Sequence, residues 1–490
     1  MTTPAFPFTL LSIDRRSKMP LYRQVYEGLR RAIVDGTLSA GRRIPSTRGL
    51  AEDLGVSRLP VLVAYEQLRH EGYLEARTGA GTFVRAVVPD HELRPRAIGT
   101  VAHTDQRPPA SPAPPLPTAR DEGGRGPFRT SLPGLDVFPR ATWSRIVASH
   151  ARRLSPAHMS YGDPAGLPRL RVAVSEHLAV ARALRCDPSQ VIIVSGSQAA
   201  LRICGAVLIR RGERVAVEEP GYPGARAALA ASGARLAPVA VDGEGLDVRA
   251  LTRLGRAVRA AYVTPSHQYP LGASMSAARR LALIEWAVRQ RAWVIEDDYD
   301  SEFRYVSRPL GALQGMGAAA AGRVIYVGTF SKVLFPALRI GYLVVPASLR
   351  EEFLAAREAL DLFSPTLYQL TLATFIQEGH LARHVRRMRV VYRERRDALL
   401  DGLERHCAGL LAVHNAEAGL HAATLLPRGV NDVDVVSRMR ASGLAATALS
   451  TCYHTRRARP GLLLGFAGAG VTALSAATRS LGEVLREPAR

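Results

Sequence analysis

Six short runs of apolar residues, separated by long segments with helical periodicity, constrain the fold of this 490-residue chain more than any other feature. The runs lie at Val191–Val194, Val215–Val217, Ala261–Val263, Trp293–Ile295, Val324–Val327 and Tyr342–Val345. None of them alternates polar and apolar residues as a strand with one face in water would, so both faces of each strand are expected to be buried. The pattern predicts an α/β domain whose largely parallel sheet is covered by helices.

The chain is too long for a single hydrophobic core, because such cores stop growing at roughly 250–300 residues. Residues 86–127 contain nine prolines and little apolar material, which is typical of a semi-extended linker. This predicts a domain at 18–85, a linker at 86–127 and a larger domain at 128–490. Within the larger domain an Arg-rich amphipathic helix begins near Glu378, and a strand is expected at Leu462–Phe466. Residues 378–490 are therefore expected to form a smaller α+β lobe.

The first domain shows three helical patterns followed by a hairpin pattern. The first helix begins near Leu21 and stops at Asp35-Gly36, and the next two are expected after the N-cap residues Ser46 and Ser57. Two short strands are expected between Tyr73 and Val84, around the turn at residues 78–81. This layout, mainly α, is that of a winged helix-turn-helix.

Charge and cysteine usage narrow the class of protein. The formal net charge of +22 favours an acidic partner such as nucleic acid, but the basic residues are spread along the chain and do not locate a DNA site. The sequence shows no signal peptide and no membrane span, so a cytoplasmic protein is expected. Cys186, Cys204, Cys407 and Cys452 are far apart, which predicts buried thiols and neither a disulfide framework nor a metal site.

Lysine occurs only at Lys18 and Lys332, whereas the other 63 basic residues are arginine. A lysine retained in such a chain suggests a role that a guanidinium cannot fill, above all that of an amine able to lose its proton and attack a carbonyl. Chance retention explains Lys18, which lies in a polar N-terminal segment. Lys332 follows a predicted strand, between hydroxyl residues and Arg339.

Polar clusters follow several of the predicted strands, where ligands bind in α/β proteins. Thr329, Ser331 and Arg339 surround Lys332 and are suited to a phosphate, as is the Ser195–Gln198 segment that opens a helix. Glu296–Tyr299 offers a carboxylate for a pyridine nitrogen and a phenol for a ring hydroxyl, and Tyr222 could stack on a planar ring. Each cluster taken alone also fits a turn, a helix start or plain packing. Their combination favours a phosphorylated carbonyl cofactor.

The motifs in these positions resemble known families. EEPGY at Glu218–Tyr222, TPSHQYPLG at Thr264–Gly272, EDDYDSEF at Glu296–Phe303 and GTFSKVLFPALRIGY at Gly328–Tyr342 resemble fold-type I, class I aminotransferases that use pyridoxal phosphate. IPSTR at Ile44–Arg48 and GVSR at Gly55–Arg58 resemble GntR-type heads. The fusion in this order, from about residue 18 to the end, resembles the MocR-type transcription regulators.

The resemblance implies a role for each matching residue. Lys332 would form the internal aldimine with pyridoxal 5'-phosphate, Asp297 would pair with the pyridine nitrogen, Tyr299 would contact the ring hydroxyl and Tyr222 would stack on the ring. The phosphate would be held by Ser197, Gln198, Thr329 and Arg339. Tyr161 would reach the phosphate of a neighbouring subunit, which implies a homodimer. The DNA-binding residues of the head would be Thr47, Arg48, Ser57, Arg58, Gly79 and Gly81.

Two departures from the family patterns bear on function. Leu463 stands where aminotransferases usually carry the arginine that clamps a substrate carboxylate, and Arg456, Arg457 and Arg459 of the preceding loop are expected to be solvated charges. In the recognition helix Leu59 and Pro60 replace polar residues, so this helix is expected to read fewer base edges directly.

Three functions remain in view. The leading hypothesis is a pyridoxal-phosphate-dependent, DNA-binding transcription regulator that senses an amine, an amino acid or the cofactor itself. The first alternative is a working aminotransferase with an accessory DNA-binding head, and a vestigial transaminase half-reaction is left open. The second alternative is a scaffold that has lost the cofactor.

Overall fold

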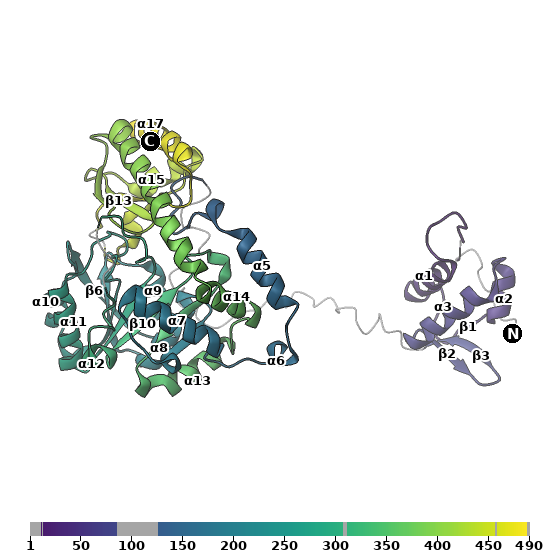
Figure 1. The fold of residues 1–490 in the computed structure, drawn as a ribbon. Coiled ribbons are helices and arrows are strands. Elements are labelled where there is room, and N and C mark those ends of the chain that lie inside the picture. The colour runs from purple at the N-terminus through teal and green to yellow at the C-terminus, as the bar shows by residue number, and fades with distance from the viewer. Residues whose placement is uncertain (1–10, 12, 86–125, 307–310, 456–457, 488–490) are drawn as a thin grey trace, which may run out of the picture. The chain divides into compact units, whose positions relative to one another are not determined.

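The computed structural model describes residues 11, 13–85, 126–306, 311–455 and 458–487. The chain divides into two units at about residue 110, and Figure 1 draws both. The predicted linker, residues 86–127, lies outside the described residues except for Gly126 and Pro127.

The N-terminal unit is the predicted winged helix-turn-helix. Its elements are α1 (Leu21–Val34), β1 (Arg43–Ile44), α2 (Thr47–Asp53), α3 (Arg58–His70), β2 (Leu74–Arg77) and β3 (Gly81–Val84). The Ser46 hydroxyl caps α2 by accepting a hydrogen bond from Gly49 N at 3.1 Å, whereas Ser57 occupies the N-cap position of α3 without such a bond. The three strands pair antiparallel in the order β1-β3-β2. β1 has only two residues, too few for an apolar pattern to predict.

The larger unit is built on an eight-stranded sheet with the order β4-β11-β10-β9-β8-β5-β6-β7. The strands are β4 (Val191–Val194), β5 (Arg214–Glu219), β6 (Arg235–Asp242), β7 (Gly245–Leu246), β8 (Val258–Val263), β9 (Trp293–Asp298), β10 (Val324–Thr329) and β11 (Gly341–Val344). All six predicted strands are confirmed. The sheet is parallel from β10 through β6, but β11 runs antiparallel to both of its neighbours. The edge strands β6 and β7 were not predicted, because β6 is partly exposed and β7 has only two residues.

Helices cover both faces of this sheet, as Figure 1 shows. They are α5 (Arg140–Ala151), α6 (Pro156–Met159), α7 (Pro168–Arg182), α8 (Ser197–Leu208), α9 (Pro223–Ala231), α10 (Val248–Arg253), α11 (Ala277–Gln290), α12 (Ala318–Ala321), α13 (Arg350–Asp361) and α14 (Thr366–Gln377). Neighbouring residues of one strand belong to different cores: Ile295 packs with the α8 and α9 side, and Val294 with the α11 side. This two-sided burial explains the uninterrupted apolar runs.

The C-terminal part of this unit is an α+β lobe. It contains α15 (His380–Cys407), β12 (Ala412–Asn415), β13 (His421–Leu425), α16 (Asp432–Ala441), β14 (Thr447–Ala448), β15 (Gly461–Gly465) and α17 (Val471–Arg486). Its strands pair antiparallel in the order β12-β13-β15-β14.

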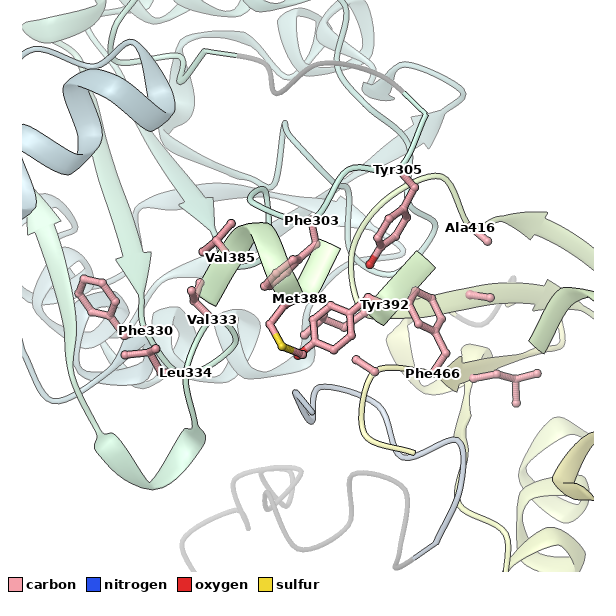
Figure 2. Packing of buried hydrophobic residues seen from close by; sticks show 14 of the residues in the cluster. Phe303, Tyr305, Phe330, Val333, Leu334, Val385, Met388, Tyr392, Ala416 and Phe466 are labelled. Atoms are coloured by element: carbon pink, nitrogen blue, oxygen red, sulfur yellow. The ribbon is translucent and has the colours of Figure 1, made fainter. Parts of the chain in front are cut away.

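The small lobe and the rest of the unit share one core. Met388 and Tyr392 of α15 lie in the same cluster as Phe303, Tyr305 and Phe466, as Figure 2 shows. The rings of Phe303 and Tyr392 meet edge to face, with centroids 4.9 Å apart. This shared packing holds β15 in position beside the ends of the central strands.

Two further predictions concern the cysteines, which were expected to be buried thiols, and the absence of a membrane-spanning helix. Cys204, Cys407 and Cys452 are buried free thiols, whereas Cys186 is only partly buried, so the prediction of buried thiols is wrong for that residue. Among the described residues, no helix combines the length and the apolar character that crossing a lipid bilayer requires.

Candidate functional site

One cavity of about 230 Å³ in the larger unit brings together nearly all of the predicted cofactor residues. Those that line it are Ser197, Gln198, Tyr222, Asp297, Tyr299, Thr329, Lys332 and Arg339. They come from four separate stretches of the chain, each at or just after the carboxyl end of β4, β5, β9 or β10. The parallel strands bring these ends to one edge of the sheet, which is the usual place for a ligand in this class of fold. One detail differs from expectation: Asp297 belongs to β9 itself, which continues to Asp298.

The phosphate-binding region predicted around Ser197 depends on a close approach between Gly196 and Arg339. The Arg339 guanidinium donates a 2.6 Å hydrogen bond to Ser195 O, and Arg339 has a φ of 53°. Gly196 has a φ of 93°, and a Cβ at this position would lie 3.0 Å from the Arg339 guanidinium. Glycine is therefore required twice, by the backbone conformation and by the space. The first turn of α8 begins at Ser197, so its free N–H groups lie beside a guanidinium, which suits an anion.

Asp297 has one satisfied and one unsatisfied carboxylate oxygen. Its Oδ2 accepts a 2.7 Å hydrogen bond from the Tyr262 hydroxyl. Its Oδ1 is buried and has no hydrogen-bond partner among the described residues. Burial raises the pKa of Asp297 from 3.8 to about 7, and the nearby Asp298 charge adds to the rise. A cationic N–H donor in the cavity would both satisfy Oδ1 and lower this pKa.

Lys332 lies in the same cavity and interacts with a segment that the sequence reasoning did not include. Its Nζ donates a 3.0 Å hydrogen bond to Ser131 O. Residues 129–132, which precede α5, form part of the cavity wall. Ser131 has a φ of 65°, an uncommon conformation for a residue other than glycine. The amine therefore contacts backbone that is held in an unusual geometry.

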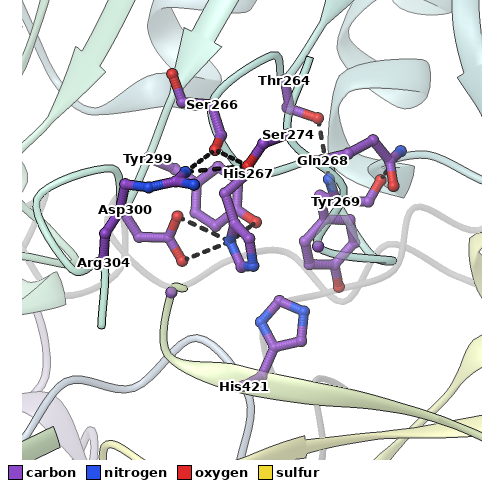
Figure 3. A network of polar contacts seen from close by, with 12 residues as sticks. Thr264, Ser266, His267, Gln268, Tyr269, Ser274, Tyr299, Asp300, Arg304 and His421 are labelled. Carbon is purple, nitrogen blue, oxygen red and sulfur yellow. Dashed lines mark hydrogen bonds and ion pairs between the residues drawn. The ribbon is translucent and has the colours of Figure 1, made fainter. Parts of the chain in front are cut away.

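Tyr299 belongs to a buried polar network, drawn in Figure 3. Its hydroxyl lies 2.9 Å from Nδ1 of His267, which in turn lies 3.0 Å from Oδ1 of Asp300. Burial raises the pKa of Tyr299 well above 10, and the Asp300 charge adds to the rise, so the phenol keeps its proton. His421 of the small lobe lies against His267, and burial lowers its pKa to about 4. The network therefore orients the Tyr299 phenol, which lines the cavity.

The small-lobe side of the cavity has an apolar base. Leu463 of β15 is fully buried and clusters with Tyr269, Ala423, Leu449 and Cys452. Tyr222 and Tyr299 pack against this cluster, and the rings of Tyr222 and Tyr269 meet edge to face with centroids 5.5 Å apart. The position at which an aminotransferase arginine was expected is thus held by a leucine that packs within an apolar cluster, and the correspondence of the two positions stays a prediction. Arg459 is exposed and does not line the cavity, and Arg456 and Arg457 lie outside the described residues.

Tyr161 is not brought to the cavity within one chain. It follows α6 and its side chain is 84% exposed. The aromatic partner in its neighbourhood is Phe363, with ring centroids 6.2 Å apart.

The predicted DNA-binding residues of the head lie on its exposed surface. Arg58 Nε donates to Thr47 Oγ1 at 3.2 Å, which joins the start of α3 to the start of α2. The Arg48 side chain is 82% exposed and lies within 3.6 Å of Glu52. Ser57 and the wing residues Gly79 and Gly81 are exposed, and both glycines have positive φ. Leu59 is 66% exposed on α3, so an apolar side chain occupies the surface of the helix expected to read DNA.

Several cavity residues were missed by the sequence reasoning. They are Arg129, Thr130, Ser131, Leu132, Tyr262, Thr264, Tyr269 and Pro336, whereas Ser331, which the sequence had suggested for a phosphate, also lines the cavity. Tyr262 could have been found, because it lies near the end of β8, next to the strand that carries Asp297. Thr264 and Tyr269 lie in the TPSHQYPLG motif, which was recognised without roles for its members. Residues 129–132 follow no strand pattern and gave no signal.

Comparison with known proteins matches two family models to the two units. Residues 21–84 match "Bacterial regulatory proteins, gntR family", and residues 140–460 match "Aminotransferase class I and II". The probable rhizopine catabolism regulatory protein MocR of Rhizobium meliloti is 39% identical over 94% of this chain and 92% of its own length. The pyridoxine biosynthesis transcriptional regulator PdxR of Corynebacterium glutamicum is 35% identical over 90% and 91%.

A solved structure with the fold of the larger unit is the α-aminoadipate aminotransferase LysN of Thermus thermophilus. It is 29% identical, covers 73% of this chain and 91% of its own, and superposes with a TM-score of 0.68. This enzyme matches only part of the chain, whereas the two regulators match nearly all of it. The head, the aminotransferase-like unit and their order along the chain identify this protein as a member of the MocR-type transcription regulators of the GntR superfamily.

Proposed function

We propose that this regulator binds pyridoxal 5'-phosphate covalently at Lys332 and that occupation of the cavity changes how its head binds DNA. The observation that carries the proposal is the buried Asp297 Oδ1, which has no partner among the described residues and lines the same cavity as Lys332. A protonated pyridine nitrogen supplies the missing N–H donor. The relative LysN was solved with a phosphopyridoxyl ligand, which supports the same chemistry here.

The other cavity residues fit the remaining parts of this cofactor. Ser197, Gln198, Thr329 and Arg339 would hold the phosphate, Tyr299 the ring hydroxyl and Tyr222 one face of the ring. When bound, the cofactor supplies an aldehyde that condenses with the Lys332 amine, with loss of water, and that a ligand amine can take over in exchange. The His267–Asp300 pair keeps the Tyr299 phenol oriented, and the Tyr262 hydroxyl keeps Asp297 oriented.

In the head, Arg48 and Arg58 would contact DNA phosphates and bases, with Thr47 and Ser57 beside them and the wing residues Gly79 and Gly81 in an adjacent groove. GntR-type heads bind DNA, and these residues are exposed except for Thr47, which is partly exposed. Titration of DNA from upstream of the native gene should give an affinity that falls steeply with salt, because phosphate contacts release counterions. Arg58→Ala should lower both the affinity and the salt dependence. If the wild-type chain does not bind at low salt, the head has another role.

We further propose a homodimer that works in the cytoplasm, where its DNA lies. Tyr161 supports the dimer, because a tyrosine that is 84% exposed in one chain is available to the cavity of a second. Tyr161→Phe should lower the cofactor affinity only if the dimer forms. Sedimentation of the cofactor-loaded chain measures the oligomeric state, and a monomer would contradict this part of the proposal.

The effector belongs to one of two classes: the cofactor itself, or a primary amine such as an amino acid. The names of the two relatives fall on either side, since one refers to pyridoxine biosynthesis and the other to rhizopine catabolism. A ligand can shift the DNA-binding state only through its different affinities for the two states. The effector must therefore change DNA affinity when it is added, whichever class it belongs to.

Covalent capture is tested by borohydride reduction of the cofactor-loaded chain, followed by peptide mass spectrometry. The chain offers a matched control, because Lys18 is its other lysine. Lys18→Ala should keep the visible absorption band and the adduct on Lys332, whereas Lys332→Ala should lose both. A wild-type chain without a band, or with the adduct elsewhere, would contradict the proposal and favour a scaffold that has lost the cofactor.

A working aminotransferase is the outcome to be excluded. Sustained turnover of an amino donor and a keto acid, abolished by Lys332→Ala, would favour it. The buried Leu463 argues against the usual substrate geometry of an aminotransferase, because no arginine stands at that position to clamp a carboxylate there.

A further inference from the structure

The cavity contains a second arginine besides Arg339, and no role has been assigned to it. Arg129 lines the cavity from the segment before α5. Among the residues that the structure describes, its side chain has no hydrogen-bond or ion-pair partner. Arg339 differs, because it is bonded to Ser195 O and lies against Gly196. An arginine that lines a cavity and has no ion-pair partner among the described residues is suited to binding an anionic group of a ligand.

Arg129 and the residues proposed for the phosphate line the cavity from different parts of the fold. Ser197 and Arg339 come from the ends of the large sheet, whereas the Arg129 segment runs along β15 of the small lobe. Phe128 O accepts a 2.9 Å hydrogen bond from Gly465 N, so Arg129 adjoins the strand that carries Leu463. A Cβ on Gly465 would come within 2.0 Å of Arg129 O, so only glycine lets the two segments meet.

The segment around Arg129 is held in a costly backbone conformation. Phe128 has a φ of 70° and Ser131 a φ of 65°, although neither is glycine. Such conformations persist where the surroundings impose them, and they concentrate at functional sites. Here the ties are the Phe128 contact with Gly465, a 3.0 Å hydrogen bond between the hydroxyls of Thr130 and Thr447, and the Lys332 bond to Ser131 O. The conformation places Arg129 in the cavity wall, two residues before Ser131, whose carbonyl oxygen the Lys332 amine contacts.

We infer that Arg129 binds the carboxylate of the effector, in place of the arginine that is absent at position 463, and that the effector is accordingly a primary amine that carries a carboxylate. The inference rests on the proposed function, because the amine of this ligand replaces Lys332 at the carbon–nitrogen double bond, and Lys332 leaves as the free amine. The ligand carboxylate meets the free guanidinium at the small-lobe side of the cavity.

This arrangement also connects the ligand to the part of the chain that leads to the head. Residues 126–132 are the first described residues of the larger unit. They carry both Arg129 and Ser131 O, the acceptor that Lys332 contacts. A ligand that replaces the Lys332 amine and binds Arg129 therefore affects this segment at two points: at Ser131 O, which Lys332 contacts, and at Arg129.

The test uses the cofactor-loaded full chain and three matched pairs of primary amines: glycine with methylamine, β-alanine with ethylamine, and 4-aminobutyrate with propylamine. Each pair differs by one carboxylate. Affinity is read from the change in the visible absorption band as amine is added. We expect at least one acid to bind about tenfold or more tightly than its partner amine, as a charge-assisted hydrogen bond requires. Arg129→Ala should bring this ratio close to one, and Arg129→Lys should restore part of it.

Arg145→Ala is the matched control, because Arg145 is exposed on α5 and does not line the cavity. This variant should keep the wild-type ratio. The same acid should change the DNA affinity of the wild-type chain and of Arg145→Ala but not that of Arg129→Ala.

Three results would overturn the inference. These are an unchanged ratio in Arg129→Ala, a wild-type chain with no preference for any acid, and a loss of cofactor affinity beyond about threefold in Arg129→Ala, which would make Arg129 a cofactor-binding residue. Failure of the proposed function itself is seen earlier and separately, as a wild-type chain that shows no cofactor band before any amine is added.

Discussion

The two sides of the cavity in the larger unit differ in what they have kept. On the side of the large sheet, the residues proposed for the cofactor converge from the ends of four strands, and Gly196, with a φ of 93°, lies close to the Arg339 guanidinium. On the small-lobe side, Leu463 has become part of an apolar cluster, and an arginine from a different segment, Arg129, lines the cavity instead. The comparison indicates a division of the cavity: the residues proposed for the cofactor lie on the large-sheet side, and the arginine proposed for the effector carboxylate adjoins the small lobe.

Leu463→Ala tests the small-lobe side and is expected to give the largest change in free energy. Removing a fully buried leucine from a packed cluster costs about 2–5 kcal/mol of unfolding free energy. Urea unfolding measures this loss, while the cofactor affinity should stay within threefold. A large loss of cofactor affinity at unchanged stability would mean that Leu463 helps to hold the cofactor. That result would contradict the difference between the two sides of the cavity.

Asp297→Asn tests the large-sheet side. The side chain keeps its size but loses the charge that a protonated pyridine would need. A hydrogen bond to a charged group contributes about 1.5–3 kcal/mol, so we expect a roughly ten- to hundred-fold weaker cofactor affinity, measured from the absorption band. Glu213→Gln, at a partly exposed residue outside the cavity, is the control. Equal affinities of Asp297→Asn and the wild-type chain would remove the ring-nitrogen role.

Gly196→Ala tests the close approach to Arg339. A φ of 93° is strained for alanine by about 1–3 kcal/mol, and the new methyl group would press on the guanidinium. Both the stability and the affinity for inorganic phosphate should fall. Gly212→Ala provides the comparison, because Gly212 has a similar φ of 88° with no atom close to an added Cβ. Gly212→Ala should lower the stability but not the affinity for phosphate. If Gly212→Ala lowers the phosphate affinity as much as Gly196→Ala does, the anion-binding role of Gly196 is contradicted.

The pH dependence of the cofactor-free chain tests the large-sheet side without any ligand. Because burial raises the pKa of Asp297 from 3.8 to about 7, the folded state holds a proton that the unfolded state releases in this range. Stability from this group is present below pH 4 and is lost as pH rises through 7, at about 1 kcal/mol per pH unit. Urea unfolding at pH 5 and pH 8 should show a larger loss in the wild-type chain than in Asp297→Asn. Equal losses would mean that Asp297 is already ionised when the cavity is empty.

The sequence predicted the strands, and the site residues that directly follow a strand. The six apolar runs located the strands, the scarcity of lysine singled out Lys332, and the polar residues after each run converge on one cavity. The residues that were missed lie where tertiary contacts determine the position. Arg129 reaches the cavity because Phe128 pairs with Gly465, a contact across more than 300 residues that leaves no periodic pattern. Ser57 shows the same limit on a smaller scale, since its N-cap position was predictable but its unbonded hydroxyl was not.

The central claim is that capture of an aldehyde by Lys332 is reported by the head. The most direct measurement is the DNA affinity of the full chain with and without pyridoxal phosphate, for Lys18→Ala and Lys332→Ala side by side. The account predicts that the cofactor changes the affinity of Lys18→Ala, corrected for any contribution of Lys18 to DNA binding itself, and leaves that of Lys332→Ala unchanged. An equal response of both variants, or a response of neither, would contradict it.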